Sequence, residues 1–154
     1  MATQYTAGLS AGEVLTAATM NSIGAVWESY TPTWTGSISN PSVGSGFIDG
    51  RYCRLQTLII ATGYIILGAG WSGGSGTYRV SLPVDALASN STIGYAALLD
   101  ASASYAGYFG SAIRQSATTA EFRIGNGVGP WSPSVPITIT QSDQMRFTLV
   151  YEAA

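Results

Sequence analysis

The strongest constraint on this chain is a close succession of short β-forming stretches from residue 30 to the C-terminus. Glycine, serine, proline and asparagine separate these stretches, and no helical apolar period lies between them. Strands that follow one another without crossover helices favour antiparallel pairing. The predicted strands cover residues 30–36, 47–55, 58–67, 77–82, 93–100, 105–114, 120–124, 137–139 and 145–152. The sequence therefore predicts a mainly β fold, an antiparallel β-sandwich or jelly roll.

Particular residues set the details of these strands. The last strand alternates, with Met145, Phe147, Leu149 and Tyr151 on one face and Gln144, Arg146 and Thr148 on the other. The apolar run 58–67 covers only about half of the ~20 residues that a membrane-spanning helix needs, so it indicates a buried strand. A tight turn at 56–57 should join it to the strand before it, in which Asp49 and Gly50 allow a bulge or turn. A proline inside 30–36 makes that stretch an edge strand.

The N-terminal part of the chain has a different character. Residues 1–15 contain glycine and serine without an apolar period, which predicts an extended arm. A short amphipathic helix follows over 16–27, with Thr16 as its cap and with Met20, Ile23 and Trp27 on one face. So short a helix is marginal alone in water, and we expect it to dock on its own β-domain, on another copy or on a partner protein. The predicted organisation is an arm with an anchor helix over 1–28 and a β-domain over 29–154.

Composition narrows the function classes. Charged residues make up 9% of the chain, against roughly 25% in ordinary soluble domains, which favours a surface covered in an assembly. The six basic residues are scattered arginines, so no stripe is present to bind nucleic acid. The first residues lack the charged and apolar regions of a secretory signal, so we expect the protein to be made and kept in a cytoplasm.

The usual catalytic and metal-binding groups are missing. The chain has no histidine, which excludes Ser-His-Asp and Cys-His arrangements and histidine-ligated metal. The single cysteine, Cys53, is expected to be a small buried strand residue. The glycine-rich stretch 68–76 lacks the lysine of a phosphate-binding loop. We therefore predict a protein that is not an enzyme and that has no catalytic residues, cofactor or metal.

Two stretches resemble segments of tailed-bacteriophage virion proteins. Residues 11–21, AGEVLTAATMN, resemble the G-x-x-L-T-A-A-x-x-N opening near the N-termini of tail-fibre, minor tail and capsid decoration proteins. Residues 29–36, SYTPTWTG, with NPSVGSG at 40–46 and Gly50-Arg51-Tyr52, resemble the Y-T-P-x-W-T-G start of a β-rich domain in phage virion proteins. Ser45 stands where that pattern has asparagine, and Gln56 where glycine is common.

The resemblance implies a structural protein of the virion, assembled in the host cytoplasm and often a homotrimer, that attaches through its N-terminal element. No heptad or β-repeat provides a long shaft, so a capsid decoration protein or a small minor tail, short tail-fibre or baseplate protein is expected. The partners would be copies of itself and another virion protein, such as the major capsid protein. The residues expected to make the attachment or oligomer contact are Leu15, Thr16, Met20, Ile23, Trp27, Tyr30 and Trp34.

A carbohydrate-binding receptor-recognition module at a tail tip is the alternative. Aromatic rings on loops or strand edges stack on sugars, and such rings would recognise a host surface glycan. The residues considered for this role are Trp71, Tyr108 and Trp131, together with Trp34. Rings that fill the core or a subunit contact are the competing interpretation.

Overall fold

The computed structural model describes residues 26–88, 91–124 and 129–154, and nearly all of its regular structure is β. The only helical element of these residues is a single 3₁₀ turn at Ala101–Ala103. This confirms the mainly β, antiparallel class. The predicted helix over 16–27 lies outside the described residues except for Val26 and Trp27, which are not helical. The strands are β1 (Glu28–Tyr30), β2 (Trp34–Gly36), β3 (Phe47–Leu55), β4 (Leu58–Ile66), β5 (Tyr78–Ser81), β6 (Thr92–Asp100), β7 (Ala106–Arg114), β8 (Thr119–Ile124), β9 (Gly129–Pro130) and β10 (Gln144–Glu152).

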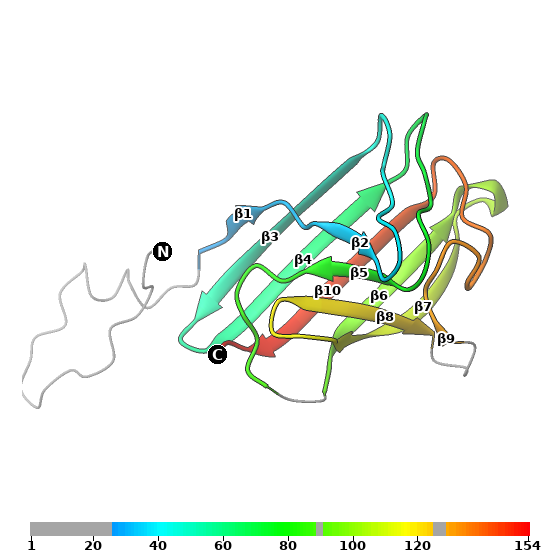
Figure 1. Cartoon of the computed structure of the whole chain (residues 1–154). Coiled ribbons are helices and arrows are strands. Elements are labelled where there is room, and N and C mark those ends of the chain that lie inside the picture. The colour runs from blue at the N-terminus through cyan, green and yellow to red at the C-terminus, as the bar shows by residue number, and fades with distance from the viewer. Residues whose placement is uncertain (1–25, 89–90, 125–128) are drawn as a thin grey trace, which may run out of the picture.

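All the strands belong to one antiparallel sheet that curls back over itself. Its order is β1-β3-β4-β10-β6-β7-β8-β5-β2, with β9 paired to β8. β1 and β2 lie at opposite ends of this path, yet only Thr31–Thr33 separates them in the chain. A link of this length reaches roughly 14 Å at most, so the two edges of the sheet must come close together. Figure 1 shows the result: β2, β5 and β8 cross in front of β3, β4 and β10.

The structure corrects the prediction for residues 30–36, which are interrupted at Pro32. The single edge strand expected there is two short strands, with β1 paired to β3 and β2 paired to β5. Proline has no amide hydrogen to donate to a ladder, so the chain leaves one edge at Pro32 and joins the other. The hydrogen-bonded strand order nevertheless makes one sheet, whereas a sandwich has two separate sheets.

Most of the other predicted strands are confirmed, with two exceptions. The hairpin turn at Gln56-Thr57 joins β3 to β4, and Gln56 takes the left-handed conformation there with φ of 55°. The alternative of a turn or bulge at Asp49-Gly50 is wrong, because β3 continues through Gly50, which pairs with Gly63. Residues 137–139 form no strand, although Ile139 is buried, and the short strand β9 was not expected.

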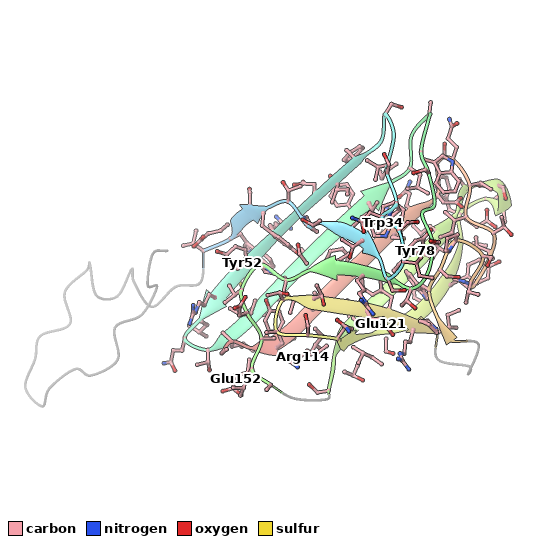
Figure 2. All side chains as sticks on the ribbon, viewed as in Figure 1. Trp34, Tyr52, Tyr78, Arg114, Glu121 and Glu152 are labelled. Atoms are coloured by element: carbon pink, nitrogen blue, oxygen red, sulfur yellow. The ribbon has the colours of Figure 1, made fainter. Side chains whose placement is uncertain are left out.

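The core lies inside the curl. Met145, Phe147, Leu149 and Tyr151 all face it, as their alternation predicts. The rings of Phe122 on β8 and Phe147 on β10 lie 5.6 Å apart, although β6 and β7 separate these strands within the sheet. Trp34 and Tyr78 pack edge to face nearby at 4.9 Å (Figure 2). Cys53 is a free, buried thiol, as expected.

Candidate binding face

The surface best suited to recognition is the side of strands β3, β4, β10, β6 and β7 that points away from the core, called here the outer face. The strand registers align its side chains in rows, because residues at alternate positions share one side of a sheet. One row runs through Asp49, Tyr64, Arg146, Ala97 and Phe109. A neighbouring row joins Arg51, Thr62, Thr148, Tyr95 and Ser111, and another joins Phe47, Ile66, Gln144 and Leu99.

Aromatic rings dominate the outer face. Phe109, Tyr95 and Phe47 are 71%, 62% and 49% exposed. Phe47 packs edge to face against Tyr64, with ring centroids 5.4 Å apart. Val150 extends the apolar surface along β10, and Leu55 and Leu58 extend it at the β3–β4 turn. These rings and aliphatic side chains form one group on β3 and β4 and another on β6 and β7. The outward side chains of β10 between the two groups are mostly polar: Gln144, Arg146 and Thr148.

Two adjoining hollows mark the β3–β4 end of this face, each of about 310 Å³. Both are lined by Thr62, Gly63 and Tyr64. The first hollow is completed by Ser29, Asp49, Gly50 and Arg51, and the second by Ile66 and Arg146. The paired glycines Gly50 and Gly63 line the floor of the first hollow, while their missing side chains would point toward the core, where a Cβ at Gly63 would meet Phe147.

Four charged side chains share the outer face with the apolar groups: Asp49, Arg51, Arg146 and Glu152. Arg51 lies under the ring of Trp27, with its guanidinium carbon 4.9 Å from the ring centroid. Such a cation–π contact contributes about 0.5–1 kcal/mol at an exposed site. The Arg146 guanidinium donates a 2.8 Å hydrogen bond to Oε1 of Gln144, which keeps it along β10 beside the second hollow. The hollows thus combine hydroxyls, one carboxylate and two guanidinium groups with the Tyr64 ring.

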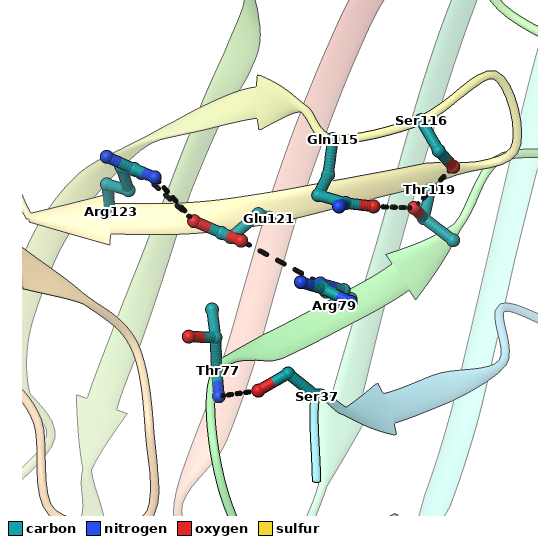
Figure 3. Close-up of polar contacts among 8 residues, drawn as sticks. All are labelled: Ser37, Thr77, Arg79, Gln115, Ser116, Thr119, Glu121 and Arg123. Carbon is teal, nitrogen blue, oxygen red and sulfur yellow. Dashed lines mark hydrogen bonds and ion pairs between the residues drawn. The ribbon is translucent and has the colours of Figure 1, made fainter.

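The most concentrated ionic group lies elsewhere, on β5 and β8. Glu121 is buried and accepts a 3.0 Å hydrogen bond from Arg123, while Arg79 lies 3.7 Å from its other oxygen (Figure 3). One carboxylate held between two guanidinium groups is suited to fixing neighbouring strands. It offers no second carboxylate for acid–base chemistry.

Asp143 also has a structural environment. Its side chain is fully buried and accepts hydrogen bonds from the backbone amides of Ala101, at 2.8 Å, and Thr140, at 2.7 Å. The carboxylate thereby ties the start of β10 to the β6–β7 connection. In the described ranges no three Cys, Asp or Glu side chains gather as metal ligands would. Nor do these ranges contain a helix long and apolar enough to cross a membrane.

The predicted contact residues fall into three groups. Leu15, Thr16, Met20 and Ile23 lie outside the described residues. Trp27 is 45% exposed at the edge of the outer face, and Tyr30 is partly buried against Tyr52. Trp34 is buried in the core, which corrects its assignment to the attachment contact because its ring has no free face.

The rings predicted to bind glycans are not the exposed ones. Trp131 is completely buried and packs 5.2 Å from Phe122, so a sugar in solution cannot reach it. Tyr108 and Trp71 are partly buried and pack against the core. Phe47, Tyr95 and Phe109, which no motif singled out, are more exposed than these candidates.

A sequence signal for the exposed rings exists in the strands themselves. The run Tyr95–Leu99 is apolar at every position, and the apolar run on β4 alternates only weakly. A strand with one solvent-exposed face alternates between polar and apolar residues, whereas continuous apolar runs occur where both faces of the sheet are buried. The excess of apolar residues could have identified the outer face before its geometry was known.

Comparisons with known proteins found no match: no family model, no curated protein and no solved structure is similar to this chain.

Proposed function

We propose that this chain is a non-enzymatic structural component of a bacteriophage virion, attached to the particle through its N-terminal segment and assembled as a homotrimer. It serves as a capsid decoration protein or as a small minor tail or baseplate protein. In this proposal the curled sheet acts as a β-sandwich of the jelly-roll type, with β2, β5 and β8 forming the second layer over the core.

The observation that carries the proposal is the set of large apolar side chains exposed on the outer face, above all Phe47, Tyr95 and Phe109. The largest exposed apolar patch of a protein is often functional, and apolar groups rimmed by polar residues mark interaction sites. A chain with only 9% charged residues has little else to keep such a surface soluble as a monomer. Copies of the protein and the particle surface would cover it. The resemblance of residues 11–21 and 29–36 to virion proteins supports the same conclusion.

The position of Trp27 supports attachment through the N-terminal segment. Its ring lies over Arg51, and β1 follows it directly along the edge of the sheet. The predicted anchor residues Met20 and Ile23 are therefore joined by a short stretch of chain to the margin of the outer face.

Particle binding tests the proposal. Purified chain is incubated with particles of a phage that lacks its gene, and occupancy is measured by quantitative mass spectrometry after sedimentation. The double variant Ile23→Lys, Trp27→Glu should lose occupancy while its far-ultraviolet circular dichroism stays unchanged. The control variant Ile38→Lys, Leu87→Glu, which changes two exposed side chains elsewhere, should bind like the wild type. Equal occupancy of both variants, or no binding by the wild type, would refute the proposal.

Glycan recognition at a tail tip is the second candidate, and the first hollow favours it. Arg51, Asp49 and Ser29 provide ionic and hydroxyl groups beside the Tyr64 ring, a combination typical of sugar sites. A glycan array is the direct test, with Arg51→Ala as the matched variant. Binding that the variant loses would support this function, and an array without signal would dismiss it.

A further inference from the structure

The two ends of the outer face are complementary in shape. Phe109 on β7 is its most exposed ring, and the hollows beside Gly63 lie on β3 and β4. Three strands, β4, β10 and β6, stand between β3 and β7 in the sheet. At about 4.8 Å for each step between strands, the ring and the first hollow are roughly 19 Å apart. Phe109 cannot reach the hollows of its own chain, so only another molecule can join these two features.

The chemistry of the two ends is complementary as well. On the outer face, the β6–β7 end presents Tyr95, Ala97, Leu99, Phe109 and Ser111, none of them charged. The hollow end supplies Arg51 and Arg146. A guanidinium group stacks favourably on an aromatic ring, and Arg146 at the margin of the second hollow is placed to contact a ring inserted there. Asp49 partly balances the two arginines, so face-to-face contact brings no large excess of like charge together.

The exposed rings contribute part of the apolar area of such a contact. A large aromatic side chain buries about 150–250 Å², so Tyr95 and Phe109 of one copy and Phe47 of its neighbour together offer on the order of 350 Å² at their observed exposures. That is roughly a fifth of the ~1,600 Å² that a standard interface buries in total. Val150, Leu55 and Leu58, each at least 40% exposed, add to it on the same face.

We infer that the outer face is the contact between copies of this chain: Phe109 of one copy inserts into the hollows beside Gly63 of the next. Such a contact joins two different patches, and head-to-tail contacts of this kind close into rings when the rotation allows it. Three of them close the trimer, with the β6–β7 half of each outer face against the β3–β4 half of its neighbour. The inference deepens the proposed function and depends on its trimeric state.

Oligomeric state is the first test. The full chain is studied by sedimentation velocity over a micromolar concentration range, as wild type, Phe109→Glu and the control Ile38→Glu. Ile38 is 81% exposed, more than Phe109, but lies outside the outer face. The wild type and the control should sediment as trimers, and Phe109→Glu as a monomer with an unchanged circular dichroism spectrum. A monomeric wild type, or a Phe109→Glu variant that remains trimeric, would overturn the inference.

Cross-linking then tests the direction of the contact without relying on disruption. In a Cys53→Ser background, Thr62→Cys marks the hollows and Ser111→Cys marks the outer face of β7 while leaving Phe109 in place. The double variant treated with a short bis-maleimide should give covalent dimers and trimers, whereas each single variant should give neither. Dimers from Ser111→Cys alone would reveal a twofold contact and overturn the inference, as would a double variant that does not cross-link.

The results also separate this inference from the proposed function. If the wild type does not bind the particle but Phe109→Glu still abolishes the trimer, the proposed function is refuted and the contact between copies stands. Retention of the trimer by Phe109→Glu overturns the contact and leaves attachment to be decided by occupancy.

Discussion

Replacing Asp143 with alanine should destabilise the fold strongly. The fully buried carboxylate accepts hydrogen bonds from the amides of Ala101 and Thr140, and a third, at 3.3 Å, from the Thr140 hydroxyl. A buried donor that loses its acceptor costs about 1–3 kcal/mol, and water reaches part of this site in the variant. We therefore expect the free energy of unfolding to fall by about 2–4 kcal/mol. For a domain of this size, that corresponds to a melting temperature lower by roughly 8–16 °C.

Urea unfolding followed by tryptophan fluorescence measures this loss, at one protein concentration for all variants because assembly makes stability concentration-dependent. Asp143→Asn keeps the shape and one acceptor oxygen, so its loss should be intermediate. Asp85→Ala is the matched control, since Asp85 is exposed and the substitution should cost less than about 0.5 kcal/mol. If Asp143→Ala costs no more than Asp85→Ala, the carboxylate does not hold β10 to the β6–β7 connection as inferred.

Three further predictions concern the core. Gly63→Ala should lower the free energy of unfolding in urea by about 1–3 kcal/mol, because the new methyl carbon would lie 2.4 Å from Cζ of Phe147. In a Phe147→Leu background the same substitution should cost much less, and equal costs in both backgrounds would contradict this explanation. Burial raises the pKa of Tyr151 from 10.0 to about 12, so its contribution to stability is complete below pH 10 and is lost as the pH rises toward 12. Absorbance at 295 nm should show delayed tyrosine ionisation in the folded wild type, and its amplitude should fall in Tyr151→Phe, where Tyr30, Tyr52 and Tyr78 still ionise late because burial raises their pKa values as well; an unchanged amplitude would contradict this. Trp131→Ala should lower the unfolding free energy by about 3–5 kcal/mol, as expected for a ring without exposed surface, and a loss below 1 kcal/mol would show that the ring is not part of the core.

The sequence by itself determined the local elements. Strands β3, β4, β6, β7 and β10 were predicted within one or two residues at each end, because alternation and turn residues act over a few positions. The Gln56-Thr57 turn and the inward row from Met145 to Tyr151 followed from the same local rules. Residues 137–139 were wrongly predicted as a strand and β9 was missed, because neither segment is long enough to show a period.

Only the tertiary structure decided where each strand lies in the sheet and which aromatic rings are buried. Pro32 marked an interruption, but nothing in residues 30–36 indicated that the two halves would join opposite edges. The curl that this link requires places Phe122 over Phe147 and encloses Trp34 and Trp131, while Phe109 stays outside. Burial depends on contacts between residues far apart in the chain, so rings that look alike in the sequence differ in exposure. For the same reason the sequence alone did not show the candidate contact between copies. It depends on the registers of five strands, which place Phe109 at one end of the outer face and the hollows beside Gly63 at the other.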